Sequence, residues 1–155
     1  MPAVGKSTIG VILAKVLGYS FLDSDLLIQE KHKKLLSEII AAKGVDGFLA
    51  IENEVNCSIK TENTVIATGG SAVYGREAMA HFKEIGKVIY LKEEFAVIEK
   101  RLSDIKGRGV VLRDGQTLQA LFHERRVLYE KYADIIIEEK SQGPEETIRE
   151  ICEKI

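Results

Sequence analysis

The sequence lacks several features that mark particular classes of protein. Its 155 residues contain no Trp, two Pro and two Cys, and Cys57 and Cys152 have no metal-type spacing. Two cysteines are too few for a disulfide framework, so we expect free thiols buried on apolar helix faces, in the reducing cytoplasm. No apolar run approaches the roughly 18 residues that span a membrane, and the N-terminus has no secretory signal pattern.

An excess of charge of one sign is also absent. The 22 Lys and Arg residues nearly balance the 24 Asp and Glu residues, which gives a net charge of −2. Nucleic-acid binding requires clustered Lys and Arg, so we expect no nucleic-acid partner and no membrane association. The length and the 45% of apolar residues predict one globular domain over residues 1–155, and we expect a monomer.

Helix and strand patterns alternate along the chain. Helical periodicity covers 5–17, 26–33, 37–43, 45–60, 75–85, 94–104, 117–133 and the segment after Pro144. Strand patterns cover 19–22, 64–68, 87–91 and 134–138. The second and third strands are apolar enough to be buried on both faces. This alternation predicts a three-layer α/β/α sandwich around a parallel sheet, with the helices of 26–60 as a substrate-binding insertion.

The segment Gly-Lys-Ser-Thr opens the first predicted helix. It matches the end of a phosphate-binding loop, G-x-x-x-x-G-K-[ST], with Val4 as the last spacer residue. The amides and dipole of a helix start attract anions. Lys6 would reach the β- and γ-phosphates, and Ser7 would ligate Mg²⁺. We therefore expect Val4, Gly5, Lys6, Ser7 and Thr8 to bind ATP; the alternative is a helix start without a ligand.

The first half of this loop motif is not in the chain. Its leading glycine would fall one residue before Met1, and the strand that should feed the loop is missing. In a phosphate-loop fold this strand is central, so its loss should expose two strand edges and a wide apolar face. We expect a misassigned start or a truncated chain, and a chain without the strand should lose stability and activity.

Two carboxylates follow the first predicted strand, at Asp23 and Asp25. In an extended turn, residues i and i+2 point the same way, so both can face the phosphate site. One can hold Mg²⁺ directly or through water, and the other can orient or deprotonate an attacking hydroxyl. The alternative is that Asp23 or Ser24 caps the helix that begins near Leu26.

Gly69 and Gly70 end the most apolar strand. Glycines let a ligand approach the backbone closely, and Thr68 or Ser71 can donate a hydrogen bond to a substrate hydroxyl. The alternative for this segment is a simple turn.

Arg125 and Glu52 each lie inside the apolar stripe of a predicted helix. A buried charge needs a partner. An anionic substrate or Glu52 would serve for Arg125, whereas Glu52 has Leu49 rather than a basic residue three positions before it. The alternative for Arg125 is a stem packed on apolar neighbours with its guanidinium in water.

A basic, glycine-rich loop spans residues 105–116. We expect it to close over ATP as a lid, with Arg108 neutralising the charge that develops on the transferred phosphoryl group. The alternative is a solvated basic loop.

In their order and spacing, these motifs resemble the shikimate kinase family. The matching segments are Gly-Lys-Ser-Thr at 5–8, Asp-Ser-Asp at 23–25, Gly-Phe at 47–48 with Glu52, Ala-Thr-Gly-Gly at 67–70, Val-Ile-Tyr-Leu at 88–91, Arg108, and Glu-Arg with Leu-Tyr within 124–129. The resemblance implies a P-loop, nucleoside-monophosphate-kinase-like fold with strand order 2-3-1-4-5, whose first strand is missing here. It also implies ATP- and Mg²⁺-dependent phosphorylation of the 3-hydroxyl of shikimate, a small hydroxy acid, in aromatic amino-acid biosynthesis.

The resemblance also implies a role for each candidate residue. It assigns phosphate contact to Lys6, Mg²⁺ binding to Ser7 and Asp23, the attacking hydroxyl to Asp25, the acceptor pocket to Phe48, Gly69, Gly70 and Ser71, the acceptor carboxylate to Arg125, the lid to Arg108 and adenine stacking to Arg101.

The chain departs from the family pattern in three places. Leu49 stands where the family has an arginine that binds the acceptor carboxylate, and loss of such a charge pair should cost several kcal/mol of binding. Ser71 replaces a third glycine, and Gly109 with Val110 replaces the proline and leucine of the lid. Two alternatives therefore stand beside a shikimate kinase. Leu49 favours a kinase for another polyol or hydroxy acid, and the missing strand favours an inactive nucleotide-binding relic.

Overall fold

The computed structural model describes residues 1–103, 112–139 and 143–155. These residues form α-helices, parallel strands and one short 3₁₀ helix. In chain order the elements are α1 (Lys6–Leu17), β1 (Ser20–Asp23), α2 (Ser24–His32), α3 (Leu36–Cys57), β2 (Thr64–Ala67), η1 (Ala72–Tyr74), α4 (Arg76–Ile85), β3 (Ile89–Lys92), α5 (Phe95–Ser103), α6 (Leu118–Tyr132), β4 (Ile135–Glu138) and α7 (Pro144–Lys154).

Local sequence signals account for several helix ends. Gly5 and Gly18 flank α1 with φ of 98° and 71°, a left-handed conformation that glycine adopts without steric cost. Gly44, at φ 70° and ψ 178°, interrupts α3 with a kink, so the two helices predicted on either side of it form one bent element. The Thr117 hydroxyl caps α6 by accepting a hydrogen bond from the Ala120 amide at 3.1 Å.

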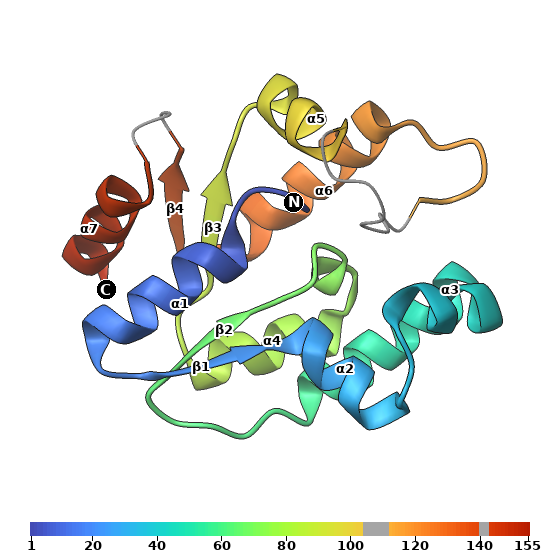
Figure 1. The fold of residues 1–155 in the computed structure, drawn as a ribbon, viewed down its shortest axis with the longest axis horizontal. Coiled ribbons are helices and arrows are strands. Elements are labelled where there is room, and N and C mark those ends of the chain that lie inside the picture. Colours follow the sequence, from blue (N-terminus) through green and yellow to red (C-terminus); the bar gives the residue numbers. More distant parts are fainter. Residues whose placement is uncertain (104–111, 140–142) are drawn as a thin grey trace.

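The strands form two separate parallel pairs, β1 with β2 and β3 with β4. The predicted parallel α/β fold is confirmed, and within the described residues β2 does not pair with β3. The pairs run in clearly different directions, with α1 crossing between them (Figure 1).

A cavity of ≈ 600 Å³ lies between the two pairs. Its walls include Val65 and Ile66 of β2, Ile89 and Leu91 of β3, and Leu13 of α1. Thr64, Val65 and Ile66 are only half-buried, so the prediction that residues 64–68 are covered on both faces is wrong. The free edge of β2 faces this cavity instead of another strand. β3 also begins two residues later than predicted.

Two apolar clusters stabilise the molecule. The larger one spans both strand pairs and includes Ile9, Ile98, Phe122 and Ile137. The smaller one joins α2 to α3 through Ile28, Ile39, Phe48 and Val55, with Leu49 packed against it. The helices of the predicted insertion thus have a core of their own, which positions Phe48 beside the candidate site.

The cysteine prediction is wrong in part. Cys57 is half-buried, but Cys152 is exposed. Helix α7 turns Ile148 and Ile151 inward, and a helix rotates by about 100° per residue, so Cys152 leaves the buried stripe.

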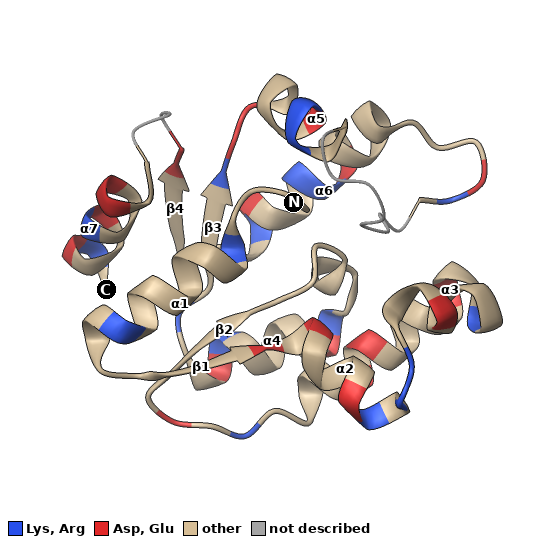
Figure 2. Cartoon of the chain, viewed as in Figure 1, with Lys and Arg blue, Asp and Glu red and all other residues tan. Residues whose placement is uncertain are grey.

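Charged residues of both signs are distributed over the described part of the chain. Basic and acidic segments alternate along the ribbon (Figure 2). Within residues 1–103, 112–139 and 143–155, none of the helices combines the length and the apolar character needed to cross a bilayer.

Candidate functional site

A second cavity, of ≈ 350 Å³, brings most of the predicted site residues together. It lies where the start of α1, the ends of β1 and β2, α3 and α6 meet, and the carboxyl ends of parallel strands are the usual place for α/β sites. Its walls include Gly5, Lys6, Ser7, Thr8, Asp23, Asp25, Phe48, Gly69, Gly70, Ser71 and Arg125. Residues far apart in the sequence therefore share one site.

The start of α1 forms one end of this cavity. Gly5 turns the chain into the helix, and the first turn of α1 carries no acidic residue. The Lys6 ammonium donates a hydrogen bond of 2.7 Å to the Met1 carbonyl, which holds the cation over the loop. Val4 is buried in the larger core, so only its backbone is available to a ligand. The amides at the helix start, the helix dipole and Lys6 together suit a polyphosphate.

Asp23 connects two elements of the site. Its Oδ2 accepts a hydrogen bond of 2.9 Å from the Ser7 hydroxyl. Its Oδ1 caps α2 by accepting from the amides of Asp25 at 3.0 Å and Leu26 at 3.4 Å. The helix-capping interpretation of Asp23 is thus confirmed, and metal binding by its other oxygen stays a prediction. The adjoining oxygens of Ser7 and Asp23 fit Mg²⁺, a hard ion that takes one or two protein ligands and completes its shell with water and substrate phosphates.

Asp25 and Glu52 approach the same glycine. A side chain at Gly69 would place its Cβ 2.3 Å from Glu52 Oε1 and 2.7 Å from Asp25 Oδ1. A side chain at position 69 would therefore displace one or both carboxyl groups, which lie close together around this glycine. The Gly69 amide also donates to the Ser24 hydroxyl at 3.3 Å, which joins the loop after β2 to the start of α2.

Arg125 is held inside the protein on α6 and is 2% exposed. The alternative that its guanidinium lies in water is therefore wrong. Its Nη1 lies 3.1 Å from the position of a Cβ at Gly70, and its guanidinium lies over the Tyr74 ring at 5.4 Å. The Tyr129 hydroxyl donates to the Gly70 carbonyl at 2.6 Å, fixing the loop beneath the arginine. A cation in this position can bind an anionic group in the cavity.

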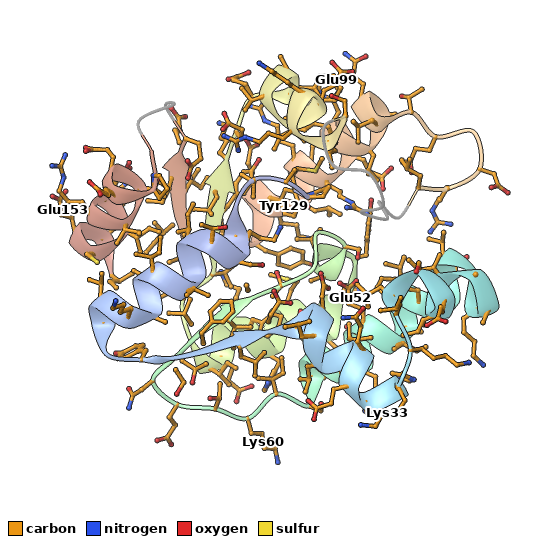
Figure 3. The ribbon with its side chains drawn as sticks, in the orientation of Figure 1. Lys33, Glu52, Lys60, Glu99, Tyr129 and Glu153 are labelled. Carbon is orange, nitrogen blue, oxygen red and sulfur yellow. The ribbon has the colours of Figure 1, made fainter. Side chains whose placement is uncertain are left out.

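Glu52 is an acid of the site whose pKa is strongly perturbed. It is 1% exposed and lies in the interior, whereas Lys33, Lys60 and Glu153 lie at the periphery (Figure 3). Burial raises its pKa from an ordinary value of 4.5 to about 7. The Ser71 hydroxyl, Arg125 and Lys6 oppose this rise in pKa, and the negative charge of Asp25 adds to it.

Some predicted residues lie apart from the cavity. Arg101 on α5 pairs with Glu93 at 3.3 Å and donates to the Ala3 carbonyl at 3.3 Å, so it contacts the phosphate loop but does not line the cavity. Its stacking on adenine stays a prediction. Arg108 and most of the predicted lid, 104–111, lie outside the described residues. Leu49 packs into the cluster of α2 and α3, away from the cavity walls.

The structure adds Gln29 and Tyr74 to the site. Gln29 lines the cavity, and its Oε1 accepts a hydrogen bond from the Leu36 amide at 3.3 Å. Tyr74 lies beneath Arg125. Neither residue belongs to a motif, and only the packing of η1 and α2 against the site reveals them.

Comparison with known proteins places these observations in context. The shikimate kinase family model matches residues 2–155. Shikimate kinase 2 of Yersinia pseudotuberculosis is 32% identical over 160 residues, which cover 97% of this chain and 89% of that protein. The structure of the Acinetobacter baumannii shikimate kinase in complex with shikimate has a TM-score of 0.86 and 30% identity, covering 97% of this chain and 86% of that one. The Aquifex aeolicus shikimate kinase has a TM-score of 0.83 and 33% identity, with 98% and 90% covered.

Proposed function

Because the chain belongs to the shikimate kinase family, we propose that it transfers the γ-phosphoryl group of ATP to the 3-hydroxyl of shikimate. The observation that carries this proposal is the single cavity in which the start of α1, the two carboxylates after β1 and the buried Arg125 meet. A phosphoryl donor, an acceptor hydroxyl and an acceptor carboxylate each find a matching group there.

Residues at the start of α1 would bind the phosphates of ATP. The amides from Gly5 onward and the Lys6 ammonium would bind the β- and γ-phosphates and offset their charge. Ser7 and Asp23 would hold Mg²⁺, which, when bound, supplies further neutralisation of the phosphates. Asp23 also caps α2, the helix that carries Asp25. The proposed metal ligand is therefore held in a fixed position relative to the acceptor side of the site.

The acceptor side belongs to the loop after β2 and to α6. Arg125 would pair with the acceptor carboxylate, and Gly69, Gly70, Ser71 and Phe48 would shape the pocket. Asp25 would accept a hydrogen bond from the attacking hydroxyl and take its proton as the new bond to phosphorus forms. The absence of a side chain at Gly69 lets the carboxyl groups of Glu52 and Asp25 approach the backbone at the acceptor pocket.

The decisive experiment measures ADP release with MgATP and a panel of acceptors. We expect turnover with shikimate and little with gluconate or other hydroxy acids. Preferred turnover of a different acceptor would support the related-kinase alternative. ATP binding without turnover of any acceptor at millimolar concentration would support the inactive relic and overturn the proposal. A monomeric state and a place in the cytoplasm stay predictions from the sequence.

A further inference from the structure

Glu52 is a buried acid to which the proposed reaction gives no role. Several charged or polar groups surround it from different elements: Asp25 of α2, Arg125 of α6, Lys6 of α1 and Ser71 before η1. Neither of its oxygens makes a hydrogen bond of good geometry within the part of the chain that the structure describes. Burial and the Asp25 carboxylate therefore disfavour the charge of Glu52, whereas the Ser71 hydroxyl, Arg125 and Lys6 favour it.

Helix α3 supplies no permanent cation that would keep Glu52 ionised. The positions one turn before it on the same face, at i−4 and i−3, are Phe48 and Leu49. Phe48 is buried and Leu49 packs against the same apolar cluster. The state of Glu52 thus depends on the charges that enter and leave the cavity.

An anionic acceptor changes this balance. With the acceptor absent, the carboxyl groups of Asp25 and Glu52 face the cations of Lys6 and Arg125. A carboxylate bound at Arg125 adds a negative charge close to both acids, in a site with little water to screen it. Asp25 and Glu52 already lie around the single position of Gly69. Taking up one proton at Glu52 removes the excess charge.

We propose that Glu52 is a positioning residue whose protonation makes Arg125 available to the acceptor carboxylate, so that acceptor binding is coupled to uptake of a proton. This inference rests on the proposed function of the site. Ionised Glu52 attracts Arg125 and competes with the acceptor for it; protonated Glu52 does not. The acceptor therefore binds most tightly where Glu52 carries its proton.

Calorimetry on the unmodified chain tests the coupling directly. Shikimate is titrated at pH 7 in two buffers of different ionisation enthalpy, and the difference in heat gives the number of protons taken up. Since burial raises the pKa of Glu52 to about 7, we expect uptake of about half a proton per acceptor at this pH and less at pH 6. Binding without proton uptake overturns the inference alone. No binding at any pH overturns the proposed function and the inference with it.

A pair of matched variants assigns the proton to Glu52. Glu52→Gln keeps the size of the side chain and removes its charge. We expect its KM for shikimate to stay low between pH 6 and 8, whereas the KM of the unmodified chain should rise up to about tenfold per pH unit above 7. Glu54→Gln, which alters an exposed acid paired with Lys31 at 3.0 Å on the same helix, should keep the original profile. A pH-dependent KM in Glu52→Gln equal to that of the unmodified chain would contradict the assignment.

Discussion

The Ser7 hydroxyl donates a hydrogen bond of 2.9 Å to Asp23 Oδ2, while Oδ1 of the same carboxylate caps α2. One side chain therefore serves both the proposed metal site and a helix start. The two roles are separable, because an amide in place of the carboxylate keeps a cap acceptor but loses the charge.

Asp23→Asn should raise the Mg²⁺ concentration needed for half-maximal turnover by tenfold or more, on the order of 1–2 kcal/mol, with little change in melting temperature. Asp23→Ala should in addition lose about 1 kcal/mol of stability, since the cap is removed. Mg²⁺ titration of turnover and thermal unfolding measure the two effects. Equal Mg²⁺ requirements in all three proteins would remove Asp23 from the metal site.

Lys6→Ala should reduce kcat to background, because the phosphates lose the cation of the helix start at the moment when charge moves onto them. Lys15→Ala provides the control. Lys15 lies in the last turn of the same helix, far from the helix start. ADP release under saturating ATP and shikimate measures both. A Lys6→Ala protein with retained kcat would remove the phosphate-loop argument.

Asp25→Asn should lower kcat far more than it raises KM, by about 10²–10⁴-fold, because the attacking hydroxyl loses its proton acceptor. The matched control is Asp46→Asn, which alters an exposed acid of α3 that pairs with Arg113 at 2.9 Å. Steady-state kinetics with varied shikimate separates kcat from KM. A rise in KM alone would show that Asp25 does not act on the reacting hydroxyl.

Arg125→Lys should raise KM for shikimate by roughly tenfold to a hundredfold, since an ammonium group cannot form the two parallel hydrogen bonds of a guanidinium. KM for ATP should change little. Arg126→Lys, at the next position of α6, affects only an exposed pair with Glu130 at 3.0 Å and should leave both constants unchanged. If Arg125→Lys weakened ATP and shikimate equally, the arginine would belong to the nucleotide side.

Glu52 should also make stability depend on pH. Its pKa is raised from 4.5 to about 7 by burial, so between these values the folded chain binds more protons than the unfolded chain. The free energy of unfolding should therefore fall as pH rises from 4.5 to 7, by at most roughly 3 kcal/mol. Denaturant unfolding at several pH values measures the slope. Glu52→Gln should flatten it, and an unchanged slope would assign the effect to another group.

Much of this site can be predicted from the sequence, because helix periodicity determines which side chains share a face. Arg125 and Glu52 interrupt apolar stripes, and both are buried in the same site. The spacing of Asp23 and Asp25 likewise predicts their common orientation. What the sequence does not contain is the tertiary arrangement: nothing near Gly69 indicates that two carboxylates flank it, and nothing near Leu49 indicates that it packs away from the cavity.

In the fold, too, features set by local conformation can be predicted from the sequence, whereas features set by tertiary contacts cannot. The glycines at 5, 18 and 44 mark helix ends and a kink, because their left-handed φ values are local properties. The exposure of Cys152 and the half-burial of β2 depend on which neighbours are present. An apolar strand pattern cannot report which strands or helices cover it in the folded chain.

Helix α1 has a mechanical consequence for the whole molecule. It packs against β1 and β2 on one side and against α7 on the other, and α7 packs against β4. Helix α1 therefore connects the two strand pairs. A nucleotide bound at the first turn of α1 would stabilise the packing of this helix against both parts of the molecule. Ligand occupancy and the integrity of the fold are thereby tied together, and each hundredfold excess of nucleotide over its Kd would add about 2.7 kcal/mol against unfolding.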